Sequence, residues 1–367
     1  MAQETEFRIR PDELREFCTR VFVALGVPHG DAEITADVLV AADLRGVDSH
    51  GVARLKRYVD GIRTGMMRLD AKPRVVHETP TTATIDADGG LGQPPSHRAM
   101  QMAIAKAEKL GAGFVAVRNS NHYGIAGYYA MMALEKDMIG ISTTNADVLV
   151  VPTFGRNAMF GTNPIAVAAP AGKERPFVLD MATSVVPRGK LEVYDRLGKP
   201  MPDGWATDET GVGTNDATRV LRNFATRAGG GLLPLGGEGE LHSGHKGYGL
   251  ALLVDILSAV LPGAAYADLV YPKTPDGKPL PANIGHFFGA LRIDGFRPVA
   301  EFKADMDELI TRIKNSPKAQ GAERIYIHGE KEFEKQAERE AHGIPLHAKV
   351  VATLREIGAE LKVPFPG

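Results

Sequence analysis

Two short segments carry the side chains most capable of chemistry. In the first, Ser49-His50-Gly51 is followed by Arg54 and Tyr58. The spacing of i, i+4 and i+8 predicts that His50, Arg54 and Tyr58 follow one helical face. An imidazole, a guanidinium and a phenol suit a carboxylate with a neighbouring oxygen, because arginine can pair with both carboxylate oxygens. On spacing alone, an ordinary solvated helix face is the slightly better interpretation.

The second segment, Asn119 to Gly124, lies between a predicted strand and a predicted helix. Polar loops at the carboxyl ends of strands are where α/β proteins tend to bind ligands. His122 can exchange a proton near neutral pH, as the oxidation of an alcohol requires. The alternative is that Asn121 caps the helix and His122 has no role, and the local sequence does not separate the two.

Three further segments contain small residues that would let a ligand approach the backbone. Gly161 to Ile165 and Leu179 to Ser184 lie at predicted strand edges, and Asp180 could accept hydrogen bonds from ribose hydroxyls. Turns with a capping aspartate are an equally good interpretation. Gly244 to Gly249 opens a helix and includes Lys246, which favours a pyrophosphate site over a merely flexible helix entry.

The usual nicotinamide fingerprint is missing. The nearest approach to G-x-G-x-x-G, Gly111 to Ala116, stands between a helix and a strand, which is the wrong order for a phosphate-binding turn. We find no Walker A sequence and no nucleophile-elbow serine. The chain must therefore bind any dinucleotide by a different route.

Hydrophobic periodicity predicts an α/β protein whose terminal helices pack together around a central sheet. Residues 1–65 are expected to be helical, and strand patterns begin at Val75. Residues 197–243 are expected to form long loops, and Lys246 to Val260 a buried helix, since it is apolar nearly all round. The later elements are expected as a strand at 284–293, helices at 304–314, 330–341 and 347–361, and a strand at 324–327.

Composition limits the class of protein. The 367 residues include 43 Lys and Arg against 45 Asp and Glu, and the net charge of -2 gives no reason to expect nucleic acid or an anionic membrane as a partner. A single cysteine, Cys18, permits no internal disulfide. The polar start is unlike a secretory signal, and the apolar run from Leu250 to Leu261 is too short to span a bilayer. A cytoplasmic protein is the expectation.

In order and spacing, these segments together resemble the malate/L-lactate dehydrogenase family, whose members bind NAD(P) without a Rossmann fold and also include sulfolactate, ureidoglycolate and diketogulonate dehydrogenases and cyclic imine reductases. The resemblance covers nearly the whole chain. It rests on Ser49 to Tyr58, Asn119 to Gly124, Gly161 to Pro164, Asp180 to Ser184, Gly244 to Gly249, Asn283 to Phe288, Gly329-Glu330 and Gly343 to Pro345.

The resemblance implies a homodimer with a central mixed-sheet nucleotide-binding domain at 76–300 and a helical domain built from residues 1–75 and 301–367. It implies His122 as the catalytic acid/base and Ser49, His50, Arg54 and Tyr58 as substrate-binding residues. The implied cofactor is NAD, with NADP left open and no metal. The implied cofactor contacts are Ala146, Asp180, Met181, Ala182, Lys246, His328, Gly329 and Glu330.

Two positions depart from the family pattern. Ala146 stands where related sequences often carry serine, which removes a hydroxyl contact to the cofactor. His328 stands where proline commonly precedes Gly329-Glu330. The segment at about 211–233 also looks longer than in compact members.

The hypothesis is hydride transfer between NAD(P) and C2 of a small 2-hydroxy or 2-keto acid of the malate, lactate or sulfolactate type. His122 would exchange the hydroxyl proton, Arg54 would hold the carboxylate, and His50 and Tyr58 would orient the C2 oxygen. Reduction of a cyclic imine carboxylate and oxidation of ureidoglycolate are alternatives within the family. A metal hydrolase and a non-catalytic binding protein are the alternatives outside it.

Overall fold

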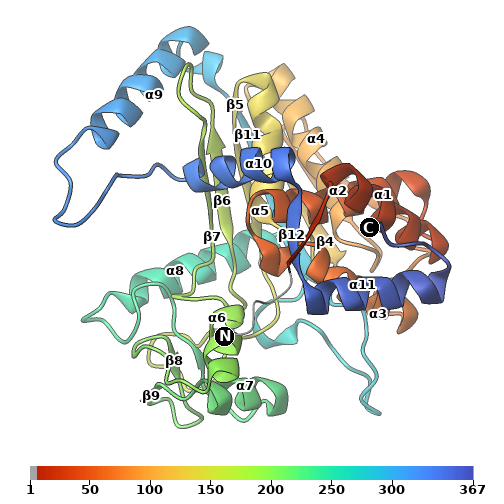
Figure 1. The fold of residues 1–367 in the computed structure, drawn as a ribbon. Coiled ribbons are helices and arrows are strands. Elements are labelled where there is room, and N and C mark those ends of the chain that lie inside the picture. The colour runs from red at the N-terminus through yellow and green to blue at the C-terminus, as the bar shows by residue number, and fades with distance from the viewer. Residues whose placement is uncertain (1–5, 367) are drawn as a thin grey trace.

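The computed structural model describes residues 6–366 and is built around one mixed sheet (Figure 1). Its seven strands lie in the spatial order β2-β3-β4-β11-β5-β6-β7. Only β3 and β4 run parallel, and the other neighbours are antiparallel. In that order the strands are β2 (Arg74–Glu78), β3 (Thr82–Asp86), β4 (Ala112–Ser120), β11 (Ile284–Arg292), β5 (Met138–Thr144), β6 (Ile165–Ala169) and β7 (Phe177–Met181).

Helices α4 (Gln93–Leu110) and α5 (Ala126–Met132) cover one face of this sheet (Figure 1). Prolines occupy the first turn of α4, where their missing N–H groups cost no helical hydrogen bond, and α4 ends at Gly111 in the left-handed conformation. The core between helices and sheet is made of small and aromatic side chains, among them Ala103, Val115, Tyr129 and Phe288. The expected central mixed sheet is confirmed.

A second unit lies below the sheet in Figure 1. It contains the three-stranded sheet β10-β8-β9 and the helices α6, α7 and α8. The predicted loop segment 197–243 is therefore partly wrong, since α7 forms there with Asp216 as its N-cap. The bounds are α6 (Arg188–Leu197), β8 (Ala206–Thr207), β9 (Gly213–Thr214), α7 (Ala217–Thr226), β10 (Gly231–Leu232) and α8 (Gly244–Asp255).

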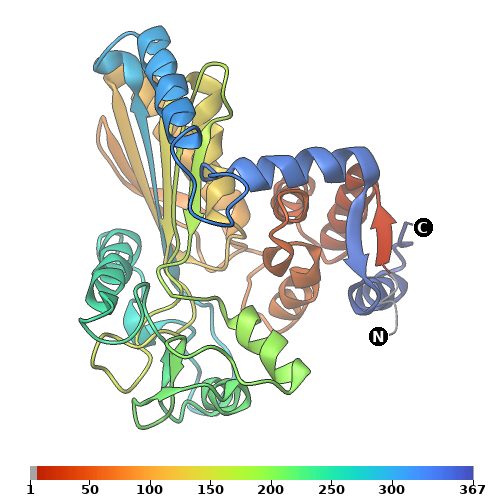
Figure 2. The same ribbon diagram turned by 60° about the vertical axis from the view of Figure 1, so that its left-hand side comes forward.

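Both ends of the described chain meet in a helical unit beside the sheet (Figure 2). Strand β1 pairs antiparallel with β12, and the helices pack around a shared apolar core. The expected helical domain built from both termini is thereby confirmed. Its elements are β1 (Glu6–Ile9), α1 (Pro11–Ala24), α2 (His29–Leu44), α3 (Leu55–Arg63), α10 (Glu330–His342), β12 (Ile344–His347) and α11 (Ala348–Leu361).

Helix α9 (Val299–Lys314) does not join the helical unit. The Asp307 carboxylate accepts N–H groups of the β6–β7 turn, at Gly172, Lys173 and Glu174. The C-terminal part was expected to begin at residue 301 and to join the helical unit as a whole. Instead, α9 contacts the β6–β7 turn of the central sheet, and only α10, β12 and α11 lie in the helical unit. The predicted strand at 324–327 is wrong, because these residues form no regular secondary structure. The Val178 N–H at the sheet edge donates to the carbonyl of His328, just after this segment.

The predicted burial of the 246–260 helix is also wrong. Helix α8 continues into a π-helical turn, Ile256–Val260. Leu252, Leu253, Ile256 and Val260 are 40 to 54% exposed. One face of the helix packs on the protein, and the other presents apolar side chains to solvent.

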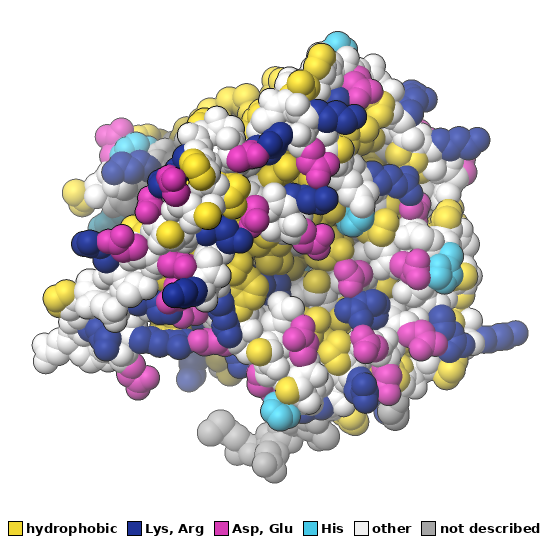
Figure 3. Space-filling model, turned by 90° about the horizontal axis from the view of Figure 1, so that it is seen from above, with side chains coloured by type: hydrophobic (Ala, Val, Ile, Leu, Met, Phe, Trp, Pro, Cys, Tyr) yellow, Lys and Arg dark blue, Asp and Glu magenta, His cyan; other side chains and the backbone are white. Residues whose placement is uncertain are grey.

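The surface elsewhere mixes charges of both signs, as Figure 3 shows for the face seen from above. No helix within residues 6–366 is long and apolar enough to cross a membrane.

Candidate active site

His122 lies in the loop that follows β4, and its neighbour anchors that loop. The Asn121 amide donates to three backbone carbonyls, those of Met66, Gly89 and Gly90, at 3.3, 3.1 and 2.8 Å. Asn121 is fully buried. The Asn121 amide therefore anchors the loop and does not cap the next helix. The alternative in which Asn121 serves only as a helix cap is thereby removed.

Gly124 brings this loop against the helical unit. Its φ is +89°, and a Cβ atom there would overlap the side chain of Val38 on α2. Only glycine tolerates both conditions. The loop is thus held at the junction of sheet and helices, where His122 meets residues from the N-terminal segment.

The segment 48–54 is not the continuous helix that the spacing predicted. Two single 3-10 turns, Asp48–His50 and Val52–Arg54, are separated by Gly51 in an extended conformation. A Cβ atom at Gly51 would overlap the carboxyl group of Asp43. Asp43 Oδ2 accepts the Val52 N–H at 2.8 Å, and burial raises the pKa of Asp43 to about 8. The break in the helix is therefore set by a buried carboxyl group behind the segment.

Despite that break, Tyr58 and His50 contact His122, and the charge of Arg54 acts on it. The Tyr58 hydroxyl lies 2.7 Å from His122 Nδ1, and the His50 ring stacks on the His122 ring at 5.6 Å between centroids. Arg54 donates to the Ser49 carbonyl at 2.6 Å. Tyr58 is fully buried, and it is not among the residues that line the cleft described below. Its role in substrate binding stays a prediction.

Both histidines are held neutral. Burial lowers the pKa of His50 to about 4, with smaller contributions from Arg54 and Arg57. Burial also lowers the pKa of His122 well below its usual value, and the nearby charges of Arg57, His50 and Arg54 act in the same direction. The Ser49 hydroxyl lies 2.9 Å from His50 Nδ1. The free site therefore carries positive charge on its guanidinium groups and none on its imidazoles at neutral pH.

Sequence reasoning missed Arg57. Its Nη2 donates to the Tyr271 hydroxyl at 2.7 Å, and its charge is the largest electrostatic contribution to the lowered pKa of His122. Arg57 follows Arg54 by three residues. On a helix this spacing makes the two side chains neighbours, so the sequence could have indicated a pair of cations here. The site thus has two guanidinium groups whose charges act on the His122 ring.

A cleft of about 520 Å³ opens beside His50. Small residues form part of its wall, including Gly124, Ala126, Ala182 and Gly329, so a flat group can approach the backbone closely. Asp180 also faces the cleft. Its Oδ2 accepts the Gly127 N–H at 2.7 Å, and burial raises its pKa to about 6. A volume in this range suits a small ligand or part of a dinucleotide.

The cleft unites only some of the expected cofactor residues. Asp180, Ala182, His328 and Gly329 line it, together with the substrate-site residues Ser49 and His50. The others lie outside this lining: Ala146, Met181, Lys246 and Glu330. Lys246 is exposed in the first turn of α8. Glu330 pairs with Lys314 at 3.0 Å and accepts the Ile327 N–H at 3.2 Å, so its carboxylate shapes the 327–330 turn.

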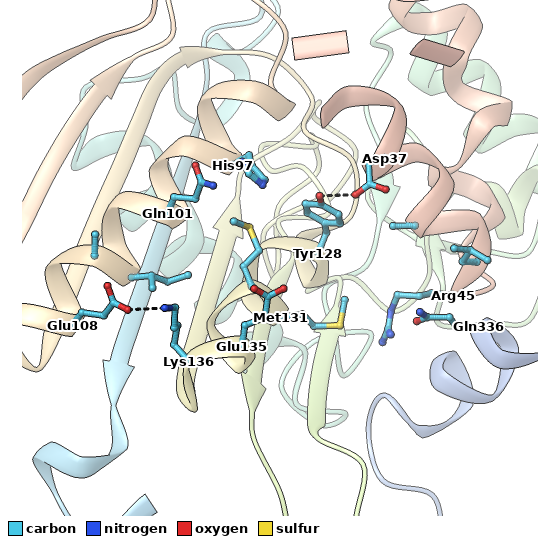
Figure 4. Close-up of a pocket in the computed structure, with 15 residues that line it drawn as sticks. Asp37, Arg45, His97, Gln101, Glu108, Tyr128, Met131, Glu135, Lys136 and Gln336 are labelled. Carbon is cyan, nitrogen blue, oxygen red and sulfur yellow. Dashed lines mark hydrogen bonds and ion pairs between the residues drawn. The ribbon is translucent and has the colours of Figure 1, made fainter. Parts of the chain in front are cut away.

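A second cleft, of about 560 Å³, lies between α2, α4, α5 and α10 (Figure 4). Two pairs of its polar side chains bond to one another: Tyr128 donates to Asp37 at 2.8 Å, and Lys136 pairs with Glu108 at 3.2 Å. Neither cleft holds a metal-ligand cluster, since residues 6–366 contain no group of three or more His, Cys, Asp or Glu side chains that could bind an ion.

The comparisons with known proteins place this fold and site in a class, the dehydrogenases of small acids. Residues 9–355 match the family model described as malate/L-lactate dehydrogenase. The chain is 53% identical over 360 residues to a malate dehydrogenase of Pyrococcus horikoshii, covering 98% of this chain and 97% of that protein. It is 38% identical to an L-sulfolactate dehydrogenase of Methanocaldococcus jannaschii, with 96% and 97% covered.

The three-dimensional comparison agrees. The crystal structure of malate dehydrogenase from Entamoeba histolytica matches with a TM-score of 0.94 at 37% identity, covering 99% of this chain and 100% of that one. The chain belongs to the malate/L-lactate dehydrogenase family. The absence of a Rossmann fingerprint in the sequence is therefore explained by a different fold for the same cofactor class.

Proposed function

We propose that the protein transfers a hydride between NAD(P) and C2 of a small 2-hydroxy or 2-keto acid, with His122 exchanging the oxygen-bound proton. The observation that carries this proposal is the convergence on His122 of Tyr58, His50 and two guanidinium groups beside a cleft. When bound, the nicotinamide supplies or accepts the hydride. All other steps fall to side chains of this chain.

Arg54 binds the C1 carboxylate, and His50, oriented by Ser49, donates to the C2 oxygen. A neutral His50 suits this role, because a donor with a lowered pKa polarises a carbonyl without surrendering its proton. His122 gives a proton to the oxygen during reduction and takes it back during oxidation. The guanidinium charges stabilise the negative charge that develops on the oxygen.

We further propose that the substrate carries a second anionic group, as malate and sulfolactate do and lactate does not. Arg57 supports this assignment, since one monocarboxylate would leave one of the two guanidinium groups without an anionic partner. The names of the relatives in Pyrococcus and Methanocaldococcus fit the same charge pattern.

Cofactor binding is assigned to Asp180, Ala182, His328 and Gly329 in the cleft, with Lys246 at the start of α8 as an anion contact. Asp180 favours NAD, because a carboxylate suits ribose hydroxyls and opposes a ribose phosphate. Ala146, Met181 and Glu330 stay predictions as cofactor residues. The cytoplasmic location also stays a prediction, which cell fractionation can test.

A homodimer is proposed as the assembled form. The apolar stripe on α8 supports it, because Leu252, Leu253, Ile256 and Val260 stand open on one helix face. Leu253→Glu is expected to shift the protein to monomer in sedimentation equilibrium. Leu241→Glu is the matched control, since Leu241 is 91% exposed just before α8. A wild-type monomer at micromolar concentration would exclude the dimer.

The decisive experiment is oxidation of NADH and of NADPH against oxaloacetate, sulfopyruvate, pyruvate and piperideine-2-carboxylate. We expect kcat/KM to be highest with NADH and a dianionic 2-keto acid, and pyruvate to be at least about tenfold poorer, the loss that one charged contact typically brings. Preference for the imine would select the cyclic imine reductase alternative, and turnover of none of the four would refute the proposed function.

A further inference from the structure

One buried cation has no partner within the described chain. Arg45 follows the last residue of α2 and is 6% exposed. Among residues 6–366 its guanidinium group makes no hydrogen bond and no ion pair, and its Nη1 atom is enclosed by protein. Taking a charge out of water is costly unless an opposite charge or hydrogen bonds compensate it, so this side chain requires an explanation.

The fold offsets only part of that cost. Arg45 stands at the carboxyl end of α2, where the helix dipole favours a cation, and its Cζ lies 4.7 Å from the centroid of the Phe333 ring. Both effects are small beside the desolvation of a buried charge. Burial lowers the pKa of Arg45, and the charges of Glu332 and Asp180 counteract this only in part. The protein itself therefore supplies no full partner for the guanidinium group.

Arg45 borders both clefts, and the larger one is unsuited to an anion. Figure 4 shows three carboxylates in its wall, those of Asp37, Glu108 and Glu135. Lys136 is the other cationic side chain among the described residues that line it, and its charge is already paired with Glu108. An anion entering this cleft would meet an excess of negative charge.

The smaller cleft is better suited. Lys331 adds a second cation to its wall, against the two carboxylates of Asp180 and Glu332. Asp180 is proposed above to bind a ribose in this cleft, and each ribose of a dinucleotide carries a phosphate on its 5′ oxygen. A buried cation in the same wall suits that phosphate, since phosphate is the anion that guanidinium groups bind best through two parallel hydrogen bonds.

We propose that Arg45 binds the pyrophosphate of the dinucleotide cofactor and is the anion contact inside the smaller cleft. The inference rests on the proposed function, which assigns the cofactor to this cleft. The guanidinium charge is delocalised over all three nitrogens, so a phosphate on the cleft side neutralises the whole group. Lys246 lies outside the cleft lining and contributes a second, weaker contact.

A buried charge that serves a ligand leaves a signature in the stability of the cofactor-free enzyme. Methionine has a similar length, keeps the contact with the Phe333 ring and needs no counter-charge. Arg45→Met should therefore leave the unfolding temperature of the cofactor-free enzyme unchanged or raise it. An arginine with a purely structural role would give the opposite result, a lower unfolding temperature, in the same circular dichroism melt.

Fragments of the cofactor separate the phosphates from the rest of the molecule. The Kd is measured by fluorescence titration for NADH and by displacement of NADH for ADP-ribose and adenosine. Arg45→Met should raise the Kd for NADH and ADP-ribose about 10- to 100-fold, the loss of a charge-assisted contact. The Kd for adenosine, which has no phosphate, should change less than about twofold. Arg45→Lys keeps the charge without the planar fork and should recover part of the loss.

Lys136→Met is the matched control, because it removes a cation that lines only the larger cleft. It should leave the Kd for NADH within about twofold of wild type. Equal weakening of NADH by Arg45→Met and Lys136→Met would assign the phosphates to the larger cleft and overturn the proposal. An unchanged Kd for NADH in Arg45→Met, or an equal loss of affinity for adenosine, would overturn it as well.

The same measurements separate this proposal from the proposed reaction. If NADH binds the wild type and the Arg45→Met effects appear, but no 2-keto acid is reduced, the reaction fails while the role of Arg45 stands. If 2-keto acids are reduced and Arg45→Met binds NADH as wild type does, the role of Arg45 fails alone. Binding of neither NADH nor NADPH to the wild type would refute both.

Discussion

Two clefts of nearly equal volume, about 560 and 520 Å³, share the wall residue Arg45 and differ in how their polar groups are used. In the larger one, Tyr128 and Asp37 bond to each other, as do Lys136 and Glu108 (Figure 4). In the smaller one, Asp180 faces the opening, and the adjoining His122 leaves a ring nitrogen without a partner among residues 6–366. The two volumes do not separate the clefts, whereas the free ring nitrogen of His122 favours the smaller cleft as the candidate site.

The largest expected difference is between His122, which adjoins the smaller cleft, and Tyr128, which lines the larger one. His122→Gln should lower kcat by about two to four orders of magnitude, because the acid/base group is lost. The Kd for NADH should change little. Tyr128→Phe removes a hydroxyl from the other cleft and should leave kcat within about twofold. Steady-state kinetics and fluorescence titration with NADH provide the measurements, and comparable losses of kcat in the two variants would erase the distinction.

Substitutions of Arg54 test whether its guanidinium group binds the substrate carboxylate. Arg54→Lys keeps the charge but loses the planar fork, so kcat/KM should fall roughly 10- to 100-fold, with kcat lowered as well as KM raised. In wild type, kcat/KM should be lower for an amide analogue of the substrate than for the acid. In Arg54→Ala, most of this difference in kcat/KM should disappear. Equal acid-to-amide ratios in wild type and Arg54→Ala would show that Arg54 does not bind the carboxylate.

The pH dependence sharpens the comparison further. Reduction needs protonated His122, and burial and the neighbouring cations place the pKa of the free ring well below 6.5. Hence kcat/KM for the 2-keto acid should fall about tenfold per pH unit between pH 7 and 9. Oxidation needs the neutral ring, so its kcat/KM should stay flat over the same interval. A plateau for reduction extending to pH 8 would mean that the acid is a group with a higher pKa.

The smallest expected effect concerns Lys246, which lies outside both clefts. Lys246→Ala should raise the Kd for NADH roughly three- to tenfold, the effect of one exposed charge near a helix start, and leave saturated kcat unchanged. Lys190→Ala on α6 is a control with a lysine that is also exposed. A collapse of kcat with an unchanged Kd would instead give Lys246 a catalytic role.

The sequence could predict the features that local patterns determine. A strand followed by a polar loop located His122, and the terminal helices indicated the second unit of the fold. Arg57 was within reach of the same reasoning, since it stands one turn after Arg54. Helix α7 could also have been predicted from the sequence, because Asp216 caps it and apolar residues recur at Val220 and Phe224. The surrounding glycine and proline residues obscured it.

Features that depend on distant contacts could not be predicted. The break at Gly51 follows from the Asp43 carboxyl group on another helix, and no local pattern announces that contact. Gln93 reads as an ordinary helix start, and no local pattern shows that its amide is buried without a hydrogen-bond partner among residues 6–366. Helix α8 is apolar nearly all round, and this pattern does not tell whether the rest of the chain covers both of its faces or only one. The exposure of one face could therefore not be predicted.

The pairing of β1 with β12 has a consequence for biosynthesis. Arg8 donates to the carbonyl of Gly343, 335 residues further along the chain, and Ile9 pairs with Ile344. While the ribosome is still adding the residues of the central sheet, β1 lacks its partner strand β12. The apolar side chains of the first helices are uncovered at that stage, because residues 344–363 complete their core. We expect this N-terminal segment to be the part most dependent on chaperones, and a circularly permuted chain that makes residues 330–361 before residue 6 to need them least.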